Sequence, residues 1–141
     1  MKQEDKQLLL QDLLARLPYG VIFYVNGHDE IADEINPFEG TVNCGFQVFD
    51  IEECKPYLRP MSSMTEEEKR ELSAKYNWSI MGNDISIRYH SEGYWDDDTE
   101  CPTNEYLELF DWLNQHHFDY RGLIEKGLAI EVNKSNNPYK H

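Results

Sequence analysis

The sequence predicts a single α+β domain, with three to four helices packed on a mostly antiparallel sheet of about four to five strands. Three observations predict this class. Leucines recur at helical spacing near the N-terminus, residues 42–48 alternate between apolar and polar side chains, and residues 78–89 have the pattern of a hairpin. We place the domain at residues 1–132 and expect the polar tail 133–141 to fray.

The first predicted elements are a helix and a strand. The helix ends at Pro18 and Gly20, and a β-rich strand over residues 19–25 follows, with a tight turn at Asn26-Gly27. The sequence does not define the strand that returns from this turn, because acidic residues follow it. The apolar face of the helix is assigned to Leu9, Leu10, Leu13, Leu14 and Leu17.

The clearest strand covers residues 42–48. Its alternation predicts that the side chains of Val42, Cys44, Phe46 and Val48 share one buried face. The next apolar residue, Phe49, follows Val48 directly, so its side chain would point to the opposite face of the same strand. This change predicts either a bulge near Val48 or a strand that is covered on both faces.

Two X-Pro steps shape residues 55–60. They predict an extended crossing segment that is not a central strand, because proline cannot donate to a ladder. Thr65 and Glu68 form a capping box that begins a surface helix, with only Leu72, Ala74 and Tyr76 as a thin anchor.

The second half of the chain is predicted to begin with a hairpin. Its strands flank residues 82–84, and a polar loop then runs to Pro102. A helix follows over residues 103–116, with Tyr106, Leu107, Phe110 and Leu113 expected on or near its inner face. Asp119 is expected to cap a short helix that ends at Lys126. Gly127 suits the left-handed position after that helix, and residues 128–132 alternate as a last strand.

Charge and cysteine content exclude several classes of protein. The formal net charge of −14 repels a phosphate backbone, so we expect no direct nucleic-acid binding. We expect a protein partner instead, and a basic surface on that partner would suit the acidic charge. Cys44, Cys54 and Cys101 form no spacing typical of disulfide frameworks or zinc sites, which favours a reducing compartment. Asp12 and Arg16 interrupt the N-terminal leucines, which does not fit a secretory signal, and no segment is long enough to span a bilayer. A cytoplasmic protein without a cofactor is expected.

The strongest functional signal lies between Arg88 and Arg121, where no lysine or arginine occurs. Aromatic residues stand among the acidic ones, and this combination favours a protein-binding face that could mimic nucleic-acid charge, although a solvated acidic surface explains the same pattern. A structural homo-oligomer is a further alternative, so the chain is expected to be a monomer or a homodimer. The predicted binding residues are Glu92, Tyr94, Trp95, Asp96, Asp97, Asp98, Glu100, Glu105 and Glu108.

The same acidic loop does not match an EF-hand. Cys101 stands where the calcium loop requires glycine, and Leu107 stands where it requires a bidentate glutamate. A metal-dependent hydrolase that uses His90, His116 and residues 96–100 stays an alternative hypothesis. We expect no catalytic residue and no bound metal.

Two adjacent histidines, His116 and His117, point about 100° apart on a helix and cannot chelate one metal together. Asp119 could pair with His116 across three positions. The preferred interpretation is structural: both histidines end a helix, where their cationic form favours the helix dipole, and Asp119 caps the next turn.

Two blocks of the chain resemble segments of short uncharacterised proteins from gut anaerobic bacteria and from their phages and mobile elements. These blocks are KPYLRPMSSMTEEEK (residues 55–69) and DWLNQHHFDYRGLIEKGLAIE (residues 111–131), roughly a quarter of the chain. The family has no established activity, so no residue role follows from the resemblance. What it implies is context: an accessory protein of phage or mobile-element type, more often a binder or modulator than an enzyme.

Overall fold

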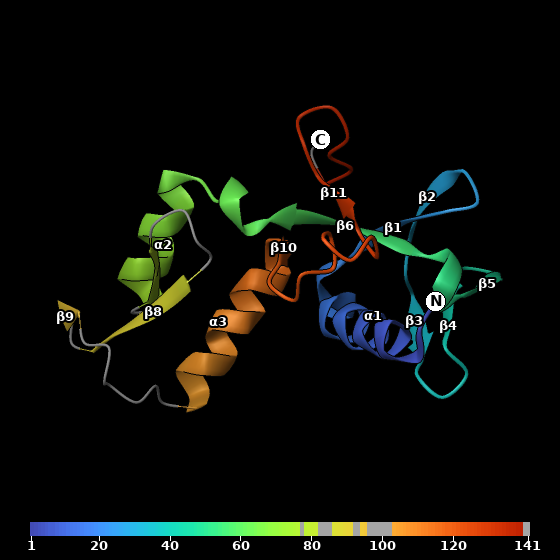
Figure 1. The fold of residues 1–141 in the computed structure, drawn as a ribbon, viewed down its shortest axis with the longest axis horizontal. Helices are drawn as coiled ribbons and strands as arrows, with labels where there is room; N and C mark the ends of the chain where they lie inside the picture. Colours follow the sequence, from blue (N-terminus) through green and yellow to red (C-terminus); the bar gives the residue numbers. More distant parts are fainter. Residues whose placement is uncertain (77, 82–85, 92–93, 96–102, 140–141) are drawn as a thin grey trace. The chain divides into compact units, whose positions relative to one another are not determined.

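The computed structural model confirms the α+β class, because it combines α-helices with mainly antiparallel strands (Figure 1). The chain forms two compact units, a division that the sequence did not predict. Unit 1 comprises residues 1–60 and 114–141, and unit 2 comprises residues 61–113. The structure describes the backbone of residues 1–76, 78–81, 86–91, 94–95 and 103–139, and the side chains of residues 1–72 and 107–139.

The helices and strands are grouped here by unit, in chain order within each unit. Unit 1 contains α1 (Gln3–Arg16), η1 (Leu17–Tyr19), β1 (Ile22–Val25), β2 (His28–Ile31), β3 (Glu34–Asn36), β4 (Thr41–Cys44), β5 (Gln47–Asp50), η2 (Ile51–Glu53), β6 (Lys55–Pro60), β10 (Phe118–Asp119) and β11 (Ile130–Glu131). Unit 2 contains η3 (Met61–Ser63), α2 (Glu66–Tyr76), β7 (Trp78–Met81), β8 (Ser86–Ser91), β9 (Tyr94–Trp95) and α3 (Thr103–Gln115), whose last two residues belong to unit 1.

The turn predicted at Asn26-Gly27 is confirmed. Both residues have positive φ, +50° and +89°, which is the pattern of a type I′ turn. The return strand that the sequence left undefined is β2, and it pairs antiparallel with β1 so that Val25 lies opposite His28.

Strand β6 lies inside the larger sheet of unit 1, where the strand order is β10–β6–β1–β2 and β11 also pairs with β6 (Figure 1). The prediction that residues 55–60 would not be a central strand is therefore wrong. β1, β10 and β11 each pair with only two residues of β6. Because the pairing is this limited, β6 needs to donate few backbone hydrogen bonds and can contain two prolines. Arg59 supplies one of them to the carbonyl of His117, while Pro56 and Pro60 supply none.

A hairpin turn at Gly45 and Phe46 divides the segment that the sequence predicts as one strand. β4 and β5 pair antiparallel, with Cys44 opposite Gln47. Gly45 has a φ of +61°, and glycine with positive φ at the first central position is typical of a type II′ turn. The change of parity in the sequence therefore marks a chain reversal, and neither a bulge nor a strand covered on both faces.

This reversal moves two predicted core residues to the surface. Val42 and Phe49 lie opposite each other and are buried. Phe46 is 107% exposed and Val48 is 62% exposed, so the prediction that they face inward is wrong. In a two-residue hairpin the inward-facing positions after the turn are set by pairing with the first strand. They do not continue the alternation of that strand, so the sequence pattern alone places them wrongly.

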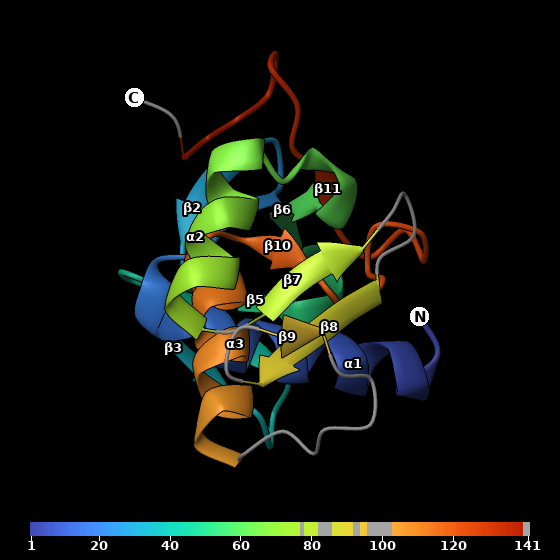
Figure 2. The ribbon, with the colours of Figure 1, turned by 90° about the vertical axis from the view of Figure 1, so that its left-hand side faces the viewer.

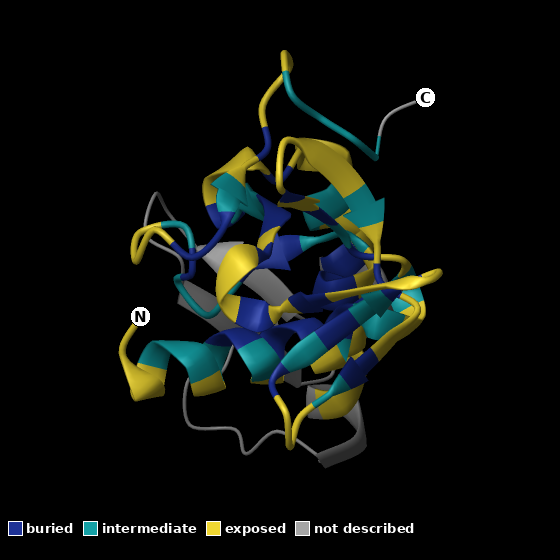
Figure 3. Cartoon of the chain, turned by 90° about the vertical axis from the view of Figure 1, so that its right-hand side faces the viewer, coloured by how far each residue is buried: buried dark blue, intermediate teal, exposed yellow. Residues whose placement is uncertain are grey.

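Helix α1 buries a different set of residues from the five leucines assigned to its face. Leu9 and Leu13 are fully buried as predicted, but Leu14 is 39% exposed. Asp12 and Arg16 are completely buried instead. The inner face therefore follows the spacing of residues 9, 12, 13 and 16, and Figure 3 shows buried and exposed stretches alternating along this helix.

The core of unit 1 joins α1, both of its sheets and the C-terminal segment. Leu13, Phe23, Val42, Leu58 and Leu123 are fully buried members of one cluster. These residues are far apart in the sequence, so the unit is held together by long-range apolar burial. Among the helices of the described residues, none has both the length and the apolar composition needed to cross a membrane.

Unit 2 contains the predicted capping box and hairpin. Thr65 N–H donates to Glu68 Oε1 at 2.9 Å, and Glu68 N–H donates to Thr65 Oγ1 at 3.1 Å. Leu72 is fully buried, as expected of the anchor of α2. β7 and β8 pair antiparallel with Ile80 opposite Ile87, and Figure 2 shows them beside α2, while the turn between them lies outside the described residues.

Candidate functional site

The predicted acidic and aromatic face lies mostly outside the described side chains. Tyr94 and Trp95 form β9, a strand that the sequence did not predict, and it pairs antiparallel with the end of β8. Glu105 lies in α3 and Glu108 is exposed on the same helix. The remaining predicted residues, Glu92, Asp96, Asp97, Asp98 and Glu100, lie outside the part of the chain that the structure describes.

The described part of α3 has two contrasting sides. Leu109 and Leu113 are buried, at 2% and 0% exposure. Leu107 is 61% exposed, so the expectation that it lies on or near the inner face is wrong, and Glu108 and Asp111 are exposed as well. The outer side of this helix therefore combines carboxylates with an apolar side chain.

The residues of the hydrolase hypothesis are only partly described. His90 lies in β8, but its side chain and residues 96–100 lie outside the described part. The ring of His116 lies beside that of Phe118, with centroids 6.5 Å apart. Within residues whose side chains are described, no three histidine, cysteine, aspartate or glutamate side chains converge as metal ligands would.

Asp12, Arg16 and Arg121 form what we call the buried ion cluster. Arg16 Nε donates to Asp12 Oδ2 at 2.8 Å, and Arg121 Nη1 donates to Asp12 Oδ1 at 2.8 Å. A second donor of Arg16, Nη2, reaches the carbonyl of Phe118 at 2.6 Å. The cluster thus joins α1 to β10 and to Arg121. Each of these two contacts connects residues more than 100 positions apart in the sequence.

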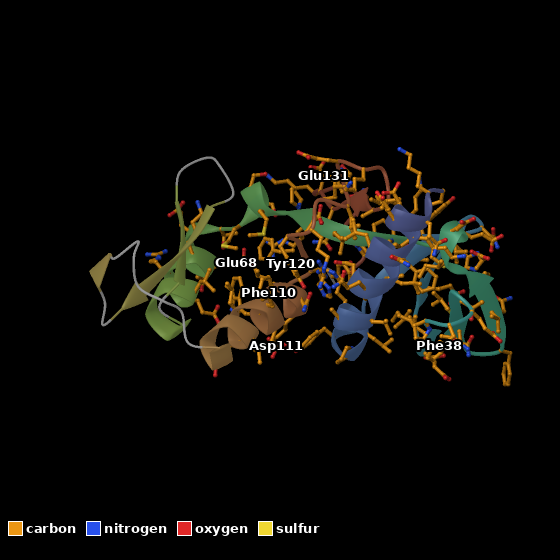
Figure 4. The ribbon with its side chains drawn as sticks, turned by 60° about the horizontal axis from the view of Figure 1, so that its bottom comes forward. Phe38, Glu68, Phe110, Asp111, Tyr120 and Glu131 are labelled. Atoms are coloured by element: carbon orange, nitrogen blue, oxygen red, sulfur yellow. The ribbon has the colours of Figure 1, made fainter. Side chains whose placement is uncertain are left out.

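Tyr120 covers this cluster. The guanidinium of Arg121 lies 4.6 Å from the centre of the Tyr120 ring, and that of Arg16 lies 5.3 Å from it. Both are cation–π contacts, in which the face of an aromatic ring attracts a positive charge. The Tyr120 hydroxyl donates to Asn114 Oδ1 at 2.7 Å, near the end of α3 (Figure 4). Each of the three charged groups therefore has an oppositely charged partner, as a buried ion pair requires, while the buried Nη1 of Arg16 makes no hydrogen bond among the described residues.

Asp119 caps a turn and not the short helix that the sequence predicts. Its Oδ1 accepts from the N–H of Leu123 and its Oδ2 from the N–H of Ile124, each at 3.0 Å. Asp119 itself belongs to β10, and residues 123–127 form turns. Gly127 has the predicted left-handed conformation, with a φ of +75°. The capping chemistry was predicted correctly, whereas the element it caps was not.

His117 is neutral, in contrast to the cationic helix end that the sequence suggests. It follows α3 with a φ of +64°, and its N–H donates to the carbonyl of Asn114. Burial, followed by the positive charges of Arg16, His116 and Arg59, lowers the pKa of the His117 imidazole to about 4. The ring stacks on Tyr139 with centroids 3.6 Å apart.

The low pKa of His117 predicts a pH-dependent stability. Because folding depresses this pKa below the usual value of 6.5, the stabilisation is complete above about pH 6.5 and is lost as the pH falls toward 4. We expect the difference in unfolding free energy between the wild type and His117→Asn to shrink by about 1 kcal/mol from pH 7.5 to pH 5, after allowance for solvent screening. Asparagine is chosen because it tolerates positive φ. Urea unfolding at several pH values measures the difference.

The control for this prediction is Gln7→Asn, because Gln7 is an exposed, uncharged residue of α1 and the change adds or removes no titratable group. Its unfolding free energy should follow the wild type at every pH. Parallel pH curves for the wild type and His117→Asn would contradict the prediction.

The C-terminal tail makes specific contacts up to its last described residue, where the sequence suggests fraying. The Tyr139 hydroxyl accepts from the N–H of Ile22 at 3.0 Å and donates to the carbonyl of Tyr57 at 2.9 Å. Burial raises the pKa of this hydroxyl, so it stays protonated and able to donate. Through the stack on His117, Tyr139 connects the tail to β1, β6 and the end of α3.

Two described cysteines are buried and free of disulfides, Cys44 and Cys54. Burial, followed by the negative charge of Glu30, raises the pKa of Cys44 to about 11. Burial also raises the pKa of Cys54 to about 12. The thiolate is the nucleophilic form, so both residues act as apolar core side chains at neutral pH.

The functional signal that the sequence analysis missed lies in the other half of the chain. Residues 17–54 also lack lysine and arginine, and the turn between β4 and β5 exposes apolar side chains within this acidic stretch. The absence of cations could have been found from the sequence, but the exposure of Phe46 and Val48 could not. Comparison of the chain with protein-family models, with curated proteins and with solved structures finds no match.

Proposed function

We propose that this chain is a non-enzymatic acidic accessory protein, of phage or mobile-element type, that acts in the cytoplasm by binding another protein with a basic surface. The observation that carries the proposal is the complete absence of lysine and arginine from residues 89–120. The binding face consists of the acidic and aromatic residues predicted there, which are Glu92, Tyr94, Trp95, Asp96, Asp97, Asp98, Glu100, Glu105 and Glu108.

The outer side of α3 supports this proposal. Leu107 is 61% exposed between exposed carboxylates, while Leu109 on the other side is buried. Protein interfaces combine an apolar centre with a polar rim, and an exposed leucine among acids provides both on a small scale. A partner with basic and apolar groups fits this chemistry best.

Charge makes the interaction dependent on salt. A run of carboxylates attracts a basic groove over about one Debye length, roughly 8 Å at physiological ionic strength. Such a run can take the place of a phosphate backbone in a groove that binds nucleic acid. We therefore expect association to be faster than for a neutral surface and to slow as salt is added.

The test is a quantitative pulldown from a bacterial lysate with the wild type and with a triple variant, Asp96→Lys, Asp97→Lys and Asp98→Lys. We expect the triple variant to lose at least about tenfold in recovery of the bound protein, because each reversal replaces an attraction with a repulsion. Recovery by the wild type should also fall between low and high salt.

A matched control carries the same change of net charge elsewhere. Glu4, Glu125 and Glu131 are exposed residues of unit 1, and the control variant replaces all three with lysine. It should retain the partner. If both triple variants lose the partner equally, net charge and not the proposed face is responsible, and the assignment of the face fails.

A further inference from the structure

The sheet formed by β3, β4 and β5 exposes apolar side chains at one place. Phe46, in the turn between β4 and β5, is 107% exposed, and Val48 in β5 is 62% exposed. The opposite side of the same sheet is packed in the core, where Ile35, Val42 and Phe49 are buried in register. Large apolar residues on a surface cost free energy in water unless a partner covers them.

Carboxylates lie next to these apolar residues. The strand register places Glu34, Asn43 and Val48 in one row across the outer side of the sheet. The carboxylate of Asp33 accepts a hydrogen bond from the N–H of Gly45 at 2.5 Å, which holds it beside the turn that carries Phe46. Glu34 is thus separated from Val48 by Asn43, and the acidic neighbours of the exposed patch are Asp33 at the turn and Asp50, which is exposed on β5 two residues after Val48.

The stretch of sequence that contains this sheet has no lysine or arginine. Residues 17–54 contain no lysine or arginine, a longer stretch than residues 89–120. Lys6 of α1 approaches this sheet at Gly40, before β4 begins and so at the end of β4 opposite the Phe46 turn. The acidic residues of the stretch are Asp29, Glu30, Asp33, Glu34, Glu39, Asp50, Glu52 and Glu53.

Strand β5 has the features of a docking edge. In the described part of the chain it is an end strand of its sheet, in the order β3–β4–β5. End strands present backbone donors and acceptors that an extended peptide can pair with, while pockets or exposed side chains select the residues of that peptide.

We propose that β5 and the Gly45–Phe46 turn bind an extended, basic segment of a partner protein. An apolar residue of that segment packs on Phe46 and Val48, and its lysine or arginine side chains lie near Asp33, beside the turn, and near Asp50, which is exposed on β5 itself. Charge complementarity selects this occupant over a second copy of the chain, because two molecules with a net charge of −14 repel each other. This surface is distinct from the face on residues 92–108, so either proposal can fail alone.

The experiment uses the full chain and a short synthetic peptide that alternates lysine with valine and has a central phenylalanine. Titration of ¹⁵N-labelled protein should shift the amide signals of β5 and the turn. The double variant Phe46→Ser, Val48→Ser should weaken binding at least about tenfold. Both residues are exposed, so the variant is expected to fold, and an unchanged urea midpoint confirms that it does.

Phe38→Ser is the matched control. Phe38 is 97% exposed in the loop between β3 and β4 (Figure 4), at the opposite end of β4 from Phe46. This variant should bind the peptide within about twofold of the wild type. Asp50→Lys should weaken binding and reduce its dependence on salt, because it reverses the carboxylate of β5 that is assigned to the basic side chains.

Three results would overturn the proposal. The first is no shift at β5 or the turn up to millimolar peptide. The second is equal binding by the wild type and by the Phe46→Ser, Val48→Ser variant. The third is equal binding of a control peptide in which glycine replaces every apolar residue, because attraction by charge alone would then explain the association.

Discussion

Replacing Asp12 with alanine is expected to lower the free energy of unfolding by about 3–5 kcal/mol. Asp12 is fully buried and accepts hydrogen bonds from both Arg16 and Arg121. Its removal leaves the fully buried guanidinium of Arg16 without a counter-charge, and an uncompensated buried charge is among the most destabilising changes in a protein. Urea unfolding followed by circular dichroism measures the loss.

Two further variants separate charge from packing. Glu4→Ala removes a carboxylate from an exposed position of the same helix and should change the unfolding free energy by less than about 0.5 kcal/mol. The double variant Asp12→Leu, Arg16→Met replaces the pair with apolar side chains of similar size and should recover much of the loss. A loss below about 1 kcal/mol for Asp12→Ala would mean that Arg16 is solvated in solution and that the buried ion cluster does not form as described.

Replacing Asp119 with alanine is expected to lower the free energy of unfolding by about 2–4 kcal/mol, because the N–H groups of Leu123 and Ile124 both lose their acceptor. The carboxylate is 8% exposed, so water cannot readily take its place. Asp119→Asn keeps one acceptor oxygen and should lose less. Equilibrium unfolding in urea gives the order of the three proteins.

Asp50 provides the matched control for this prediction. It also accepts a backbone hydrogen bond, from the N–H of Glu52 at 2.9 Å, but it is exposed. Asp50→Ala should therefore cost about 1 kcal/mol or less, the usual effect of losing an exposed cap. Equal losses for the two variants would show that burial does not strengthen the cap at Asp119.

Local signals predicted the elements that depend on neighbouring residues. The capping box at Thr65 and Glu68, the turn at Asn26-Gly27 and the left-handed Gly127 were all predicted from spacings of a few residues, and the structure confirms them. Such features are decided by hydrogen bonds and φ angles within one turn of the chain. The short helix predicted after Asp119 failed because a capping aspartate can serve a turn as well as a helix.

The environment of buried residues could not be predicted in the same way. Asp12 and Arg16 looked like surface charges on an apolar helix, yet their partners include the carbonyl of Phe118 and the side chain of Arg121. No property of α1 indicates that these groups lie beside it. For the candidate site, the lack of cations was visible in the sequence, but the exposure of Phe46 depends on a turn that interrupts a regular alternation.

By itself, the sequence determined the α+β class, the acidic charge, the main helices and the hairpin from Trp78 to Ser91, because helical periodicity, capping and tight turns act over a few residues. Only the tertiary structure decided that β6 is central, that Asp12 and Arg16 are buried, and that Phe46 faces water. The physical reason is that burial and strand order depend on partners far along the chain. A charged residue can be buried in the core only where a distant side chain of opposite charge pairs with it. An apolar residue such as Phe46 is exposed where a turn reverses the chain and ends the alternation of the strand.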